Sequence, residues 1–444
     1  MQGKNLVDMP DKPVPDNLEK LPRNLGVWGI WLLAVNGFIG AGIFGLPGGA
    51  ARLAGDFSPI VFVLCALLIL PVMLSFAELA SYFRGTGGPV RYASEAFGPF
   101  LGFQAGWLFY IARVVGFSAN SVLLVDSIGY FWHAATHGIP RIALLAGICG
   151  SLMAINVVGS MRAIRSLATL TVLKFAVLIL VVTVGMAMLG GHILGQVSLT
   201  PPRGANVGAA LVLMVYAYVG WEAAVIPAGE ARNPERDMPR GLLLGLVSVS
   251  VLYLLIQLVS MAAVPQLGFS STPLLDVAAA LMGPVGAGIL MFGVVASVGG
   301  NLLGTIFATP RLSYSLAMDG SLPPWFARVH PRFLTPANSI VFQGVVSFLI
   351  AAFGSFIWLA AATVLARLLL YILTCATVPV LRPRHAGPGR FVLPLGYLIP
   401  LLGILASVWL MLQVSRASFV LTGVLVIVGS GLYGLERWRR RRLV

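Results

Sequence analysis

Charged residues are scarce in this sequence: only 10% of its 444 residues are Asp, Glu, Lys or Arg. A soluble domain carries about 25% of these residues, because they cover the surface that faces water. Hydrophobic residues make up 58% of the chain. The composition therefore excludes a soluble protein and indicates a membrane protein. A membrane-spanning helix takes about 20 apolar residues, so the length allows about a dozen spans and no large soluble domain.

Cysteine and histidine are also rare, with three and five residues respectively. Each cysteine lies in an apolar stretch, and we interpret Cys65, Cys149 and Cys375 as small apolar fillers rather than a disulfide set. The cysteines and histidines have no metal-ligand spacing, and the histidines fall in or near loops. We therefore expect no metal, no cofactor and no buried histidine proton relay. The sequence also lacks the GxxxxGK[ST] loop that would indicate ATP-driven transport.

Apolar residues form twelve long stretches, each long enough to cross a membrane as a helix. They run near residues 26–50, 58–83, 97–132, 141–160, 166–190, 206–230, 240–264, 280–316, 338–354, 357–381, 392–413 and 418–435. The strands of a membrane barrel would instead alternate apolar and polar positions over about ten residues. The sequence predicts an all-α polytopic membrane protein with 12 transmembrane helices.

The basic residues indicate how the chain crosses the membrane. The side that carries the N-terminus holds 21 of the 29 Lys and Arg residues, the other side holds four, and four fall within stretches. Because cytoplasmic loops are rich in Lys and Arg, we expect both termini to be cytoplasmic in a multi-pass protein of the inner membrane. The net charge of +14 is then mostly a topology signal. We expect the final Arg run to contact anionic lipid headgroups, and we expect no nucleic acid partner.

Two of the stretches contain residues that interrupt helices. In the first, Gly37, Gly40, Gly42 and Gly45 crowd the centre, and each weakens a helix by about 1 kcal/mol relative to alanine. Taken alone, this cluster fits small-residue helix packing equally well. The sixth stretch reads VYAYVGWEAAVIPAG and has Gly220 near its middle.

The two interruptions occupy corresponding places if the chain consists of two five-helix halves plus two further helices. Interrupted spans at matching places in two halves are typical of a transporter with a binding site at the membrane midplane. Free amides at the start of a half-helix attract a carboxylate, and free carbonyls at an opposing half-helix end attract an ammonium group. One such site fits both ends of an amino acid.

At these residues the sequence resembles the amino acid–polyamine–organocation (APC) transporter superfamily. Four segments carry the resemblance: GFIGAGIFGLP at 37–47, ELASYFRGTGGPVRYASEAFGPFLGFQAGW at 78–107, YAYVGWEAAVIPAGEARNPERDMPRG at 216–241, and RLSYSLAMDGSLPPWFARVHPRFLTPANSI at 311–340. The resemblance implies a 5+5 inverted repeat of the leucine-transporter type, with helices 1 and 6 discontinuous and helices 11 and 12 peripheral.

The resemblance also divides the chain into parts. They are a cytoplasmic N-terminal tail at 1–24, a first inverted repeat at 25–190, a second at 204–385, helices 11 and 12 at 391–436, and a basic cytoplasmic tail at 437–444. The polar composition of the first part is not that of a signal peptide.

Substrate contacts follow from the resemblance by position. The amides around Ala41 and Gly42 would hold the substrate carboxylate, and the carbonyls of Phe38, Tyr216 and Val219 would hold its amino group. Tyr216 falls where the family has a gating aromatic, although ordinary aromatic packing is the alternative. The full expected set of substrate-binding residues is Phe38, Ile39, Gly40, Ala41, Gly42, Arg113, Tyr216, Ala217 and Val219.

Ionisable residues inside spans are costly, so each is a functional candidate. Lys174 is the only lysine beyond residue 20. Lysine, unlike arginine, can lose its proton when it is buried, and sodium-independent members of the family carry a lysine at a similar place. We expect Lys174 to replace sodium and to link proton state to conformation. The alternative is a lysine that extends towards the inner membrane surface.

Two further ionisable residues lie at depth. We expect Glu222 either to sense protons or to cap free amides at the second interruption. Arg113 either contacts the substrate or pairs internally with a carboxylate such as Glu222 or Glu78, and the internal pair is the favoured expectation. The remaining intramembrane charges, Glu78, Asp126, Arg311 and Arg367, are assigned to structure and topology.

These features favour a secondary active amino acid transporter that is sodium-independent and proton-coupled, and no constellation of catalytic residues indicates an enzyme. The side chains that we expect around the substrate are mostly apolar or aromatic and favour neutral amino acids, with Arg113 as the objection; they are Phe38, Ala112, Phe117, Tyr216 and Thr305. An exchanger, an exporter or a non-transporting sensor remain alternatives. We expect a monomer or weak homodimer.

Overall fold

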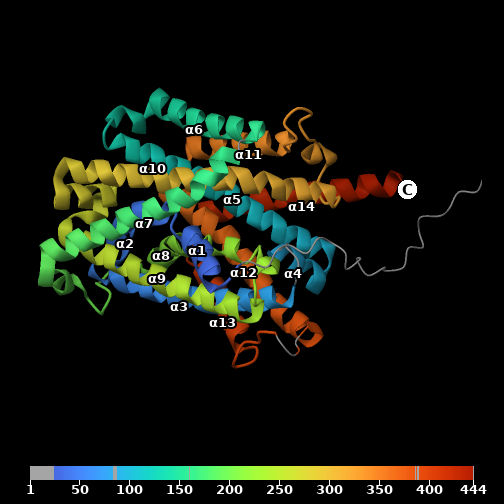
Figure 1. The fold of residues 1–444 in the computed structure, drawn as a ribbon, viewed down its shortest axis with the longest axis horizontal. Coiled ribbons are helices and arrows are strands. Elements are labelled where there is room, and N and C mark those ends of the chain that lie inside the picture. Colours follow the sequence, from blue (N-terminus) through green and yellow to red (C-terminus); the bar gives the residue numbers. More distant parts are fainter. Residues whose placement is uncertain (1–24, 84–87, 160, 386, 388–389, 444) are drawn as a thin grey trace, which may run out of the picture.

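A computed structural model describes residues 25–83, 88–159, 161–385, 387 and 390–443 (Figure 1). The predicted cytoplasmic tail at 1–24 therefore lies outside the described residues. Within the described part, all regular structure is helical, apart from one isolated bridge between Leu25 and Ala231. The expectation of an all-α protein is confirmed.

The helices follow the predicted stretches. In chain order the α-helices are α1 Val27–Phe38, α2 Gly42–Ala54, α3 Ser58–Tyr82, α4 Gly88–Phe97, α5 Pro99–Gly129, α6 Gly138–Val158, α7 Met161–Leu189, α8 Val207–Val215, α9 Pro234–Ala263, α10 Pro273–Met318, α11 Ala337–Phe353, α12 Phe356–His385, α13 Leu398–Met411 and α14 Arg416–Leu443. The 3₁₀ turns are η1 Gly55–Phe57, η2 His133–Thr136, η3 Gly190–Gln196, η4 Tyr216–Tyr218, η5 Trp221–Ala224, η6 Ala228–Glu230, η7 Leu267–Phe269 and η8 Pro324–Ala327.

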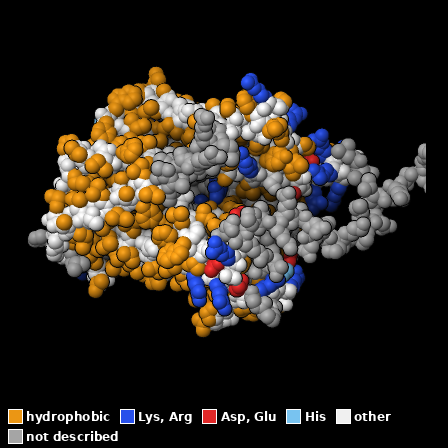
Figure 2. All heavy atoms as spheres, viewed as in Figure 1, with side chains coloured by type: hydrophobic (Ala, Val, Ile, Leu, Met, Phe, Trp, Pro, Cys, Tyr) orange, Lys and Arg blue, Asp and Glu red, His pale blue; other side chains and the backbone are white. Residues whose placement is uncertain are grey.

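Length and apolarity make this a multi-pass membrane protein. Nine helical segments of the described chain are long and apolar enough to cross a membrane, and α1, α11 and α13 are shorter apolar helices. The longest, α10, joins two helices across a kink at Gly283, where φ is 65°. Figure 2 shows hydrophobic side chains over most of the visible surface, with Lys and Arg gathered towards one end.

The interrupted helices lie in the interior of the bundle. Figure 1 shows α1, α8 and α12 at its centre, with α6 and α11 along one edge. The last two helices, α13 and α14, both pack against α12. The helix α14 continues through the basic residues at the end of the chain to Leu443.

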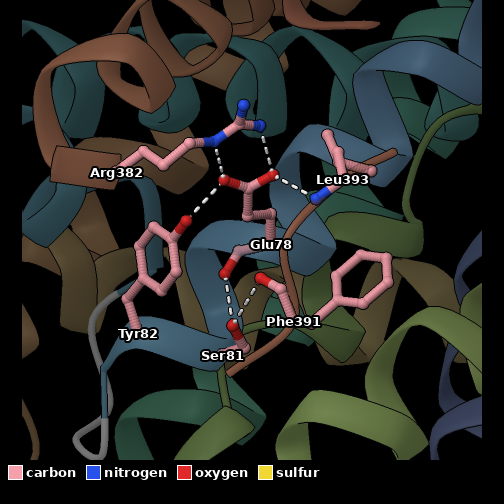
Figure 3. Close-up of polar contacts among 6 residues, drawn as sticks. All are labelled: Glu78, Ser81, Tyr82, Arg382, Phe391 and Leu393. Carbon is pink, nitrogen blue, oxygen red and sulfur yellow. Dashed lines mark hydrogen bonds and ion pairs between the residues drawn. The ribbon is translucent and has the colours of Figure 1, made fainter. Parts of the chain in front are cut away.

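A buried ion pair joins α3 to α12 (Figure 3). Both nitrogens of the Arg382 fork contact Glu78, with Nε 2.7 Å from Oε1 and Nη2 2.7 Å from Oε2. The Tyr82 hydroxyl donates to Oε1, and the Leu393 amide donates to Oε2 over 2.9 Å. A buried pair is tolerable only when its remaining hydrogen-bonding capacity is met in this way. The carboxylate of Glu78 is therefore fully used by Arg382, Tyr82 and Leu393.

Candidate functional site

The first interruption lies between α1 and α2, at Ile39, Gly40 and Ala41. The Ile39 amide still donates to Val35, and the Gly40 amide donates to the Phe38 carbonyl over 2.9 Å. In contrast, the amides of Ala41, Gly42 and Ile43 make none of the hydrogen bonds found among the described residues. The first amides of a helix have no partner within it, so α2 begins with free donors. The predicted break in the first span is confirmed.

The second interruption follows α8, as predicted. The chain turns through η4, becomes extended at Val219, and reaches φ 109° at Gly220 before η5 begins. That left-handed backbone conformation favours glycine, which has no Cβ to clash.

The two interruptions touch each other through glycine. A Cβ added to Gly37 would lie 2.3 Å from the Gly220 carbonyl oxygen, and a Cβ added to Gly220 would lie 2.2 Å from the Gly37 oxygen. Likewise, a Cβ on Gly42 would lie 2.7 Å from the Ala217 Cα. The missing side chains therefore permit the two broken segments to pack backbone against backbone.

A cavity of about 340 Å³ lies against both interruptions. Most of the substrate-binding residues expected from the sequence line it: Phe38, Gly40, Ala41, Gly42, Arg113, Tyr216 and Val219. Ile39 and Ala217 do not line it. The other expected wall residues, Ala112, Phe117 and Thr305, do. A volume of this size is at the lower end of the range of about 300–1,000 Å³ for small-molecule sites.

Two backbone carbonyls at the cavity differ in the number of hydrogen bonds that they already accept. The Phe38 carbonyl accepts two hydrogen bonds, from the Gly40 amide and from the Tyr253 hydroxyl, both over 2.9 Å. The Val219 carbonyl accepts none of those found in the described chain. Val219 is therefore the better placed of these two to receive an ammonium group.

Lys174 comes from α7 and binds the end of α1. Its Nζ donates to the Asn36 carbonyl over 2.9 Å, to Asn36 Oδ1 over 2.7 Å and to the Ile39 carbonyl over 2.6 Å. The side chain is 3% exposed and lines the cavity. All three ammonium protons are thus directed at the interruption rather than at a membrane surface.

Glu222 is buried directly behind the cavity wall. Its Oε1 accepts from Arg367 Nη1 over 2.6 Å and from the Tyr371 hydroxyl, while its Oε2 accepts from the Gly220 amide over 2.7 Å. Glu222 therefore takes the capping position expected at the second interruption. Arg367, which was expected to serve structure and topology, is 8% exposed and lines the cavity. An arginine inside an apolar span is the sequence signal that could have identified Arg367 as a residue of the site.

Arg113 forms no direct salt bridge with Glu222 or Glu78, although the charge of Glu222 still attracts its guanidinium. Glu222 pairs with Arg367 and Glu78 pairs with Arg382, so neither carboxylate binds Arg113. The guanidinium of Arg113 lies over the Phe109 ring, 4.7 Å from its centre. Arg113 makes no hydrogen bond or ion pair with any residue that the structure describes.

Asn120, Asn301 and Thr305 join Tyr216 in a polar network at the cavity. Asn120 and Asn301 were not expected from the sequence, and Thr305 was expected only as a wall residue. The Tyr216 hydroxyl donates to Asn120 Oδ1 over 2.7 Å, and Asn120 Nδ2 donates to Asn301 Oδ1 over 2.8 Å. The Thr305 hydroxyl lies 3.4 Å from the same Asn301 oxygen. A neutral amide inside a span carries no charge signal, so sequence alone did not single out Asn120 or Asn301.

Among the residues described, no group of three or more His, Cys, Asp or Glu side chains lies close enough to hold a metal ion.

Comparison with known proteins places the chain among transporters. Residues 25–432 match the family model described as amino acid permease. The chain is similar to the serine/threonine exchanger SteT of Bacillus subtilis, with 26% identity over 94% of this chain and 98% of the relative. It is also similar to the branched-chain amino acid permease BcaP of the same organism, with 26% identity over 96% of this chain and 95% of the relative. A methylthioribose transporter of B. subtilis is 27% identical over 94% of each chain.

Proposed function

Because this chain belongs to the amino acid permease family of the APC superfamily, whose members are membrane transporters and not enzymes, we propose that it moves amino acids by secondary active transport. The observation that carries the proposal is the pair of broken helices at one cavity. Free amides at the start of α2 and a free carbonyl at Val219 both belong to the segments that form its wall.

The proposed binding mode uses the polarity of the two breaks. The substrate carboxylate binds the amides around Ala41 and Gly42, where the start of a helix favours an anion. The substrate ammonium binds backbone carbonyls of the second break, with Val219 as the principal acceptor. Tyr216 closes over the bound substrate, supported by its hydrogen bond to Asn120. Alternating access then moves the substrate past this site.

Lys174 takes the place of a coupling cation in this proposal. A sodium ion binds backbone carbonyls, and the Lys174 ammonium already satisfies those of Asn36 and Ile39. We therefore propose sodium-independent transport in which protonation of Lys174 stabilises the end of α1. Loss of that proton would release the α1 carbonyls and couple protons to conformation. Glu222 contributes by holding the second break through the Gly220 amide.

The proposed topology is the one expected from the sequence. It has 12 transmembrane helices, with an inverted repeat at 25–190 and 204–385 and peripheral helices at 391–436. Both termini are cytoplasmic and the protein lies in the inner membrane. Its basic end contacts anionic headgroups. The packing of both α13 and α14 against α12 supports their place beside the second repeat.

The side-chain preference expected from the sequence is for neutral amino acids. The walls at Ala112 and Phe117 support it, and so do the relatives named for serine, threonine and branched-chain amino acids. The guanidinium of Arg113, which forms no ion pair with the described residues, opposes it.

The proposal is tested with purified protein in two steps. Thermal shifts with twenty amino acids and several amines identify ligands, and flux of the best ligands is then measured in proteoliposomes. We expect uptake that needs no sodium and accumulates substrate against its gradient when a pH gradient is imposed. Absence of any ligand-dependent flux would contradict transport.

The same liposomes separate the alternatives. Flux that requires amino acid on the far side indicates exchange, and outward movement driven by the pH gradient indicates export. Ligand binding without flux indicates a sensor. Sedimentation in detergent measures whether the protein is the expected monomer or weak homodimer.

A further inference from the structure

The cavity carries an excess of positive charge. Three cationic side chains line it, namely Lys174, Arg113 and Arg367, and none of the described residues that line it is acidic. Glu222 compensates Arg367 from behind the wall, and Lys174 is bound to backbone carbonyls. Arg113 is therefore the cation whose charge no described carboxylate meets directly. A charge inside a membrane that forms no ion pair is expensive and is a functional candidate.

Arg113 and Arg367 face the cavity from neighbouring helices. The helices α5 and α12 pack closely, and a Cβ added to Gly116 would lie only 3.5 Å from Thr363 Cγ2. Gly116 and Thr363 are each one helical turn from one of the arginines, and the guanidinium of Arg113 is repelled by that of Arg367 and attracted by the carboxylate of Glu222 behind it. Like charges held together in this way are stabilised by an anion between them.

Each arginine also has hydrogen-bonding capacity to spare. Arg367 gives its Nη1 to Glu222, but its Nε is buried with no hydrogen-bond partner. Arg113 donates no hydrogen bond from its five N–H groups to any residue that the structure describes. Unmet buried donors cost free energy, whereas a bound carboxylate would accept from both side chains.

We propose that Arg113 and Arg367 form a subsite for an anionic substrate side chain, so that the protein prefers an acidic amino acid to the matched amide. This inference rests on the proposed transport function and replaces its expected preference for neutral amino acids. The α-carboxylate binds the free amides at the start of α2, and the side-chain carboxylate binds the arginine pair. Arg113 supplies specificity, and Glu222 positions Arg367.

The test compares ligands that differ only in charge. Thermal shifts of the purified full-length protein are titrated with L-glutamate against L-glutamine and with L-aspartate against L-asparagine. We expect the acids to act at concentrations at least about tenfold lower than the amides, because hydrogen bonds between charged groups are stronger than those to a neutral amide. Equal or better binding of the amides by the unmodified protein would overturn the inference, whatever the variants do.

A variant then assigns the preference to one side chain. Arg113→Gln should lose the preference for acids while still binding glutamine, and Arg113→Lys should keep part of it because it retains the charge but not the fork. The matched control is Arg311→Gln, since Arg311 bonds the Phe307 carbonyl of its own helix and does not line the cavity. Equal loss of glutamate binding in the Arg113 and Arg311 variants would contradict the assignment.

Failure of the inference is distinguishable from failure of the proposed function. Binding and flux of neutral amino acids without binding of acids would overturn the anionic subsite and leave transport standing. Absence of binding by any amino acid would overturn both.

Discussion

Lys174 and Ile39 are joined by a 2.6 Å hydrogen bond, from the Lys174 ammonium to the carbonyl of the residue that follows the end of α1. The bond links α7 to a broken helix that is 135 residues away in the sequence. In the proposed mechanism the geometry of the first interruption depends on whether Lys174 is protonated, since only the ammonium has three donors for the three acceptors that it contacts.

Lys174→Met should therefore abolish flux and its dependence on pH in proteoliposomes. The substitution keeps the length of the side chain but removes the donor of the hydrogen bonds to Asn36 and Ile39, and loss of a buried hydrogen-bond partner costs about 1–3 kcal/mol. Substrate binding is measured in parallel by thermal shift, to separate a coupling defect from unfolding. A variant that transports normally with the original pH profile would rule out a coupling role for Lys174.

Glu222 and Arg367 should behave as a unit in unfolding. Glu222→Gln leaves a buried guanidinium without its counterion, and removal of one partner of a buried pair costs about 3–5 kcal/mol. We expect the double variant Glu222→Gln, Arg367→Met to melt at a higher temperature than the single Glu222→Gln variant.

The pair of Asp126 and Arg141 supplies the control. These side chains are 24% and 19% exposed and 3.4 Å apart, so Asp126→Asn should cost only about 0–1 kcal/mol. Equal destabilisation by Glu222→Gln and Asp126→Asn in detergent would show that burial of the first pair has no energetic consequence.

Gly37→Ala should separate the two interruptions and remove transport. Its methyl group would lie 2.3 Å from the backbone oxygen of Gly220, and backbone cannot move aside as a flexible side chain can. Gly147→Ala in α6 is the matched control, because a Cβ there meets nothing within 4 Å. We expect normal yield, melting temperature and flux for Gly147→Ala. Wild-type flux in Gly37→Ala would contradict the close approach.

Tyr216 should act through its ring more than through its hydroxyl. The ring contacts Phe356 edge-on, with 5.8 Å between centres, and the hydroxyl adds one hydrogen bond to Asn120. We expect Tyr216→Phe to lower flux by less than about tenfold, because a neutral hydrogen bond contributes about 1 kcal/mol. Tyr216→Ala should lose flux almost entirely. If Tyr216→Ala retained flux and substrate affinity, the proposed gating role would be wrong.

Much of the site could be predicted because its signals are local. Glycines within an apolar run weaken a helix wherever it packs, so both interruptions were found from sequence at Gly37–Gly45 and Gly220. Lys174 could be singled out from the sequence because a charged side chain inside an apolar span costs free energy, which makes it a functional candidate. Asn120 and Asn301 were missed, since a neutral amide is not costly enough to stand out.

The membrane class, the helical stretches and the positions of the breaks were thus determined by the sequence itself, because hydropathy and helix propensity are properties of neighbouring residues. Only the tertiary structure decided which charges meet. Glu222 binds Arg367, 145 residues away, and leaves Arg113 free, although both arginines lie within spans. A salt bridge depends on distances of a few ångströms between packed helices, and no local pattern along the chain encodes that distance.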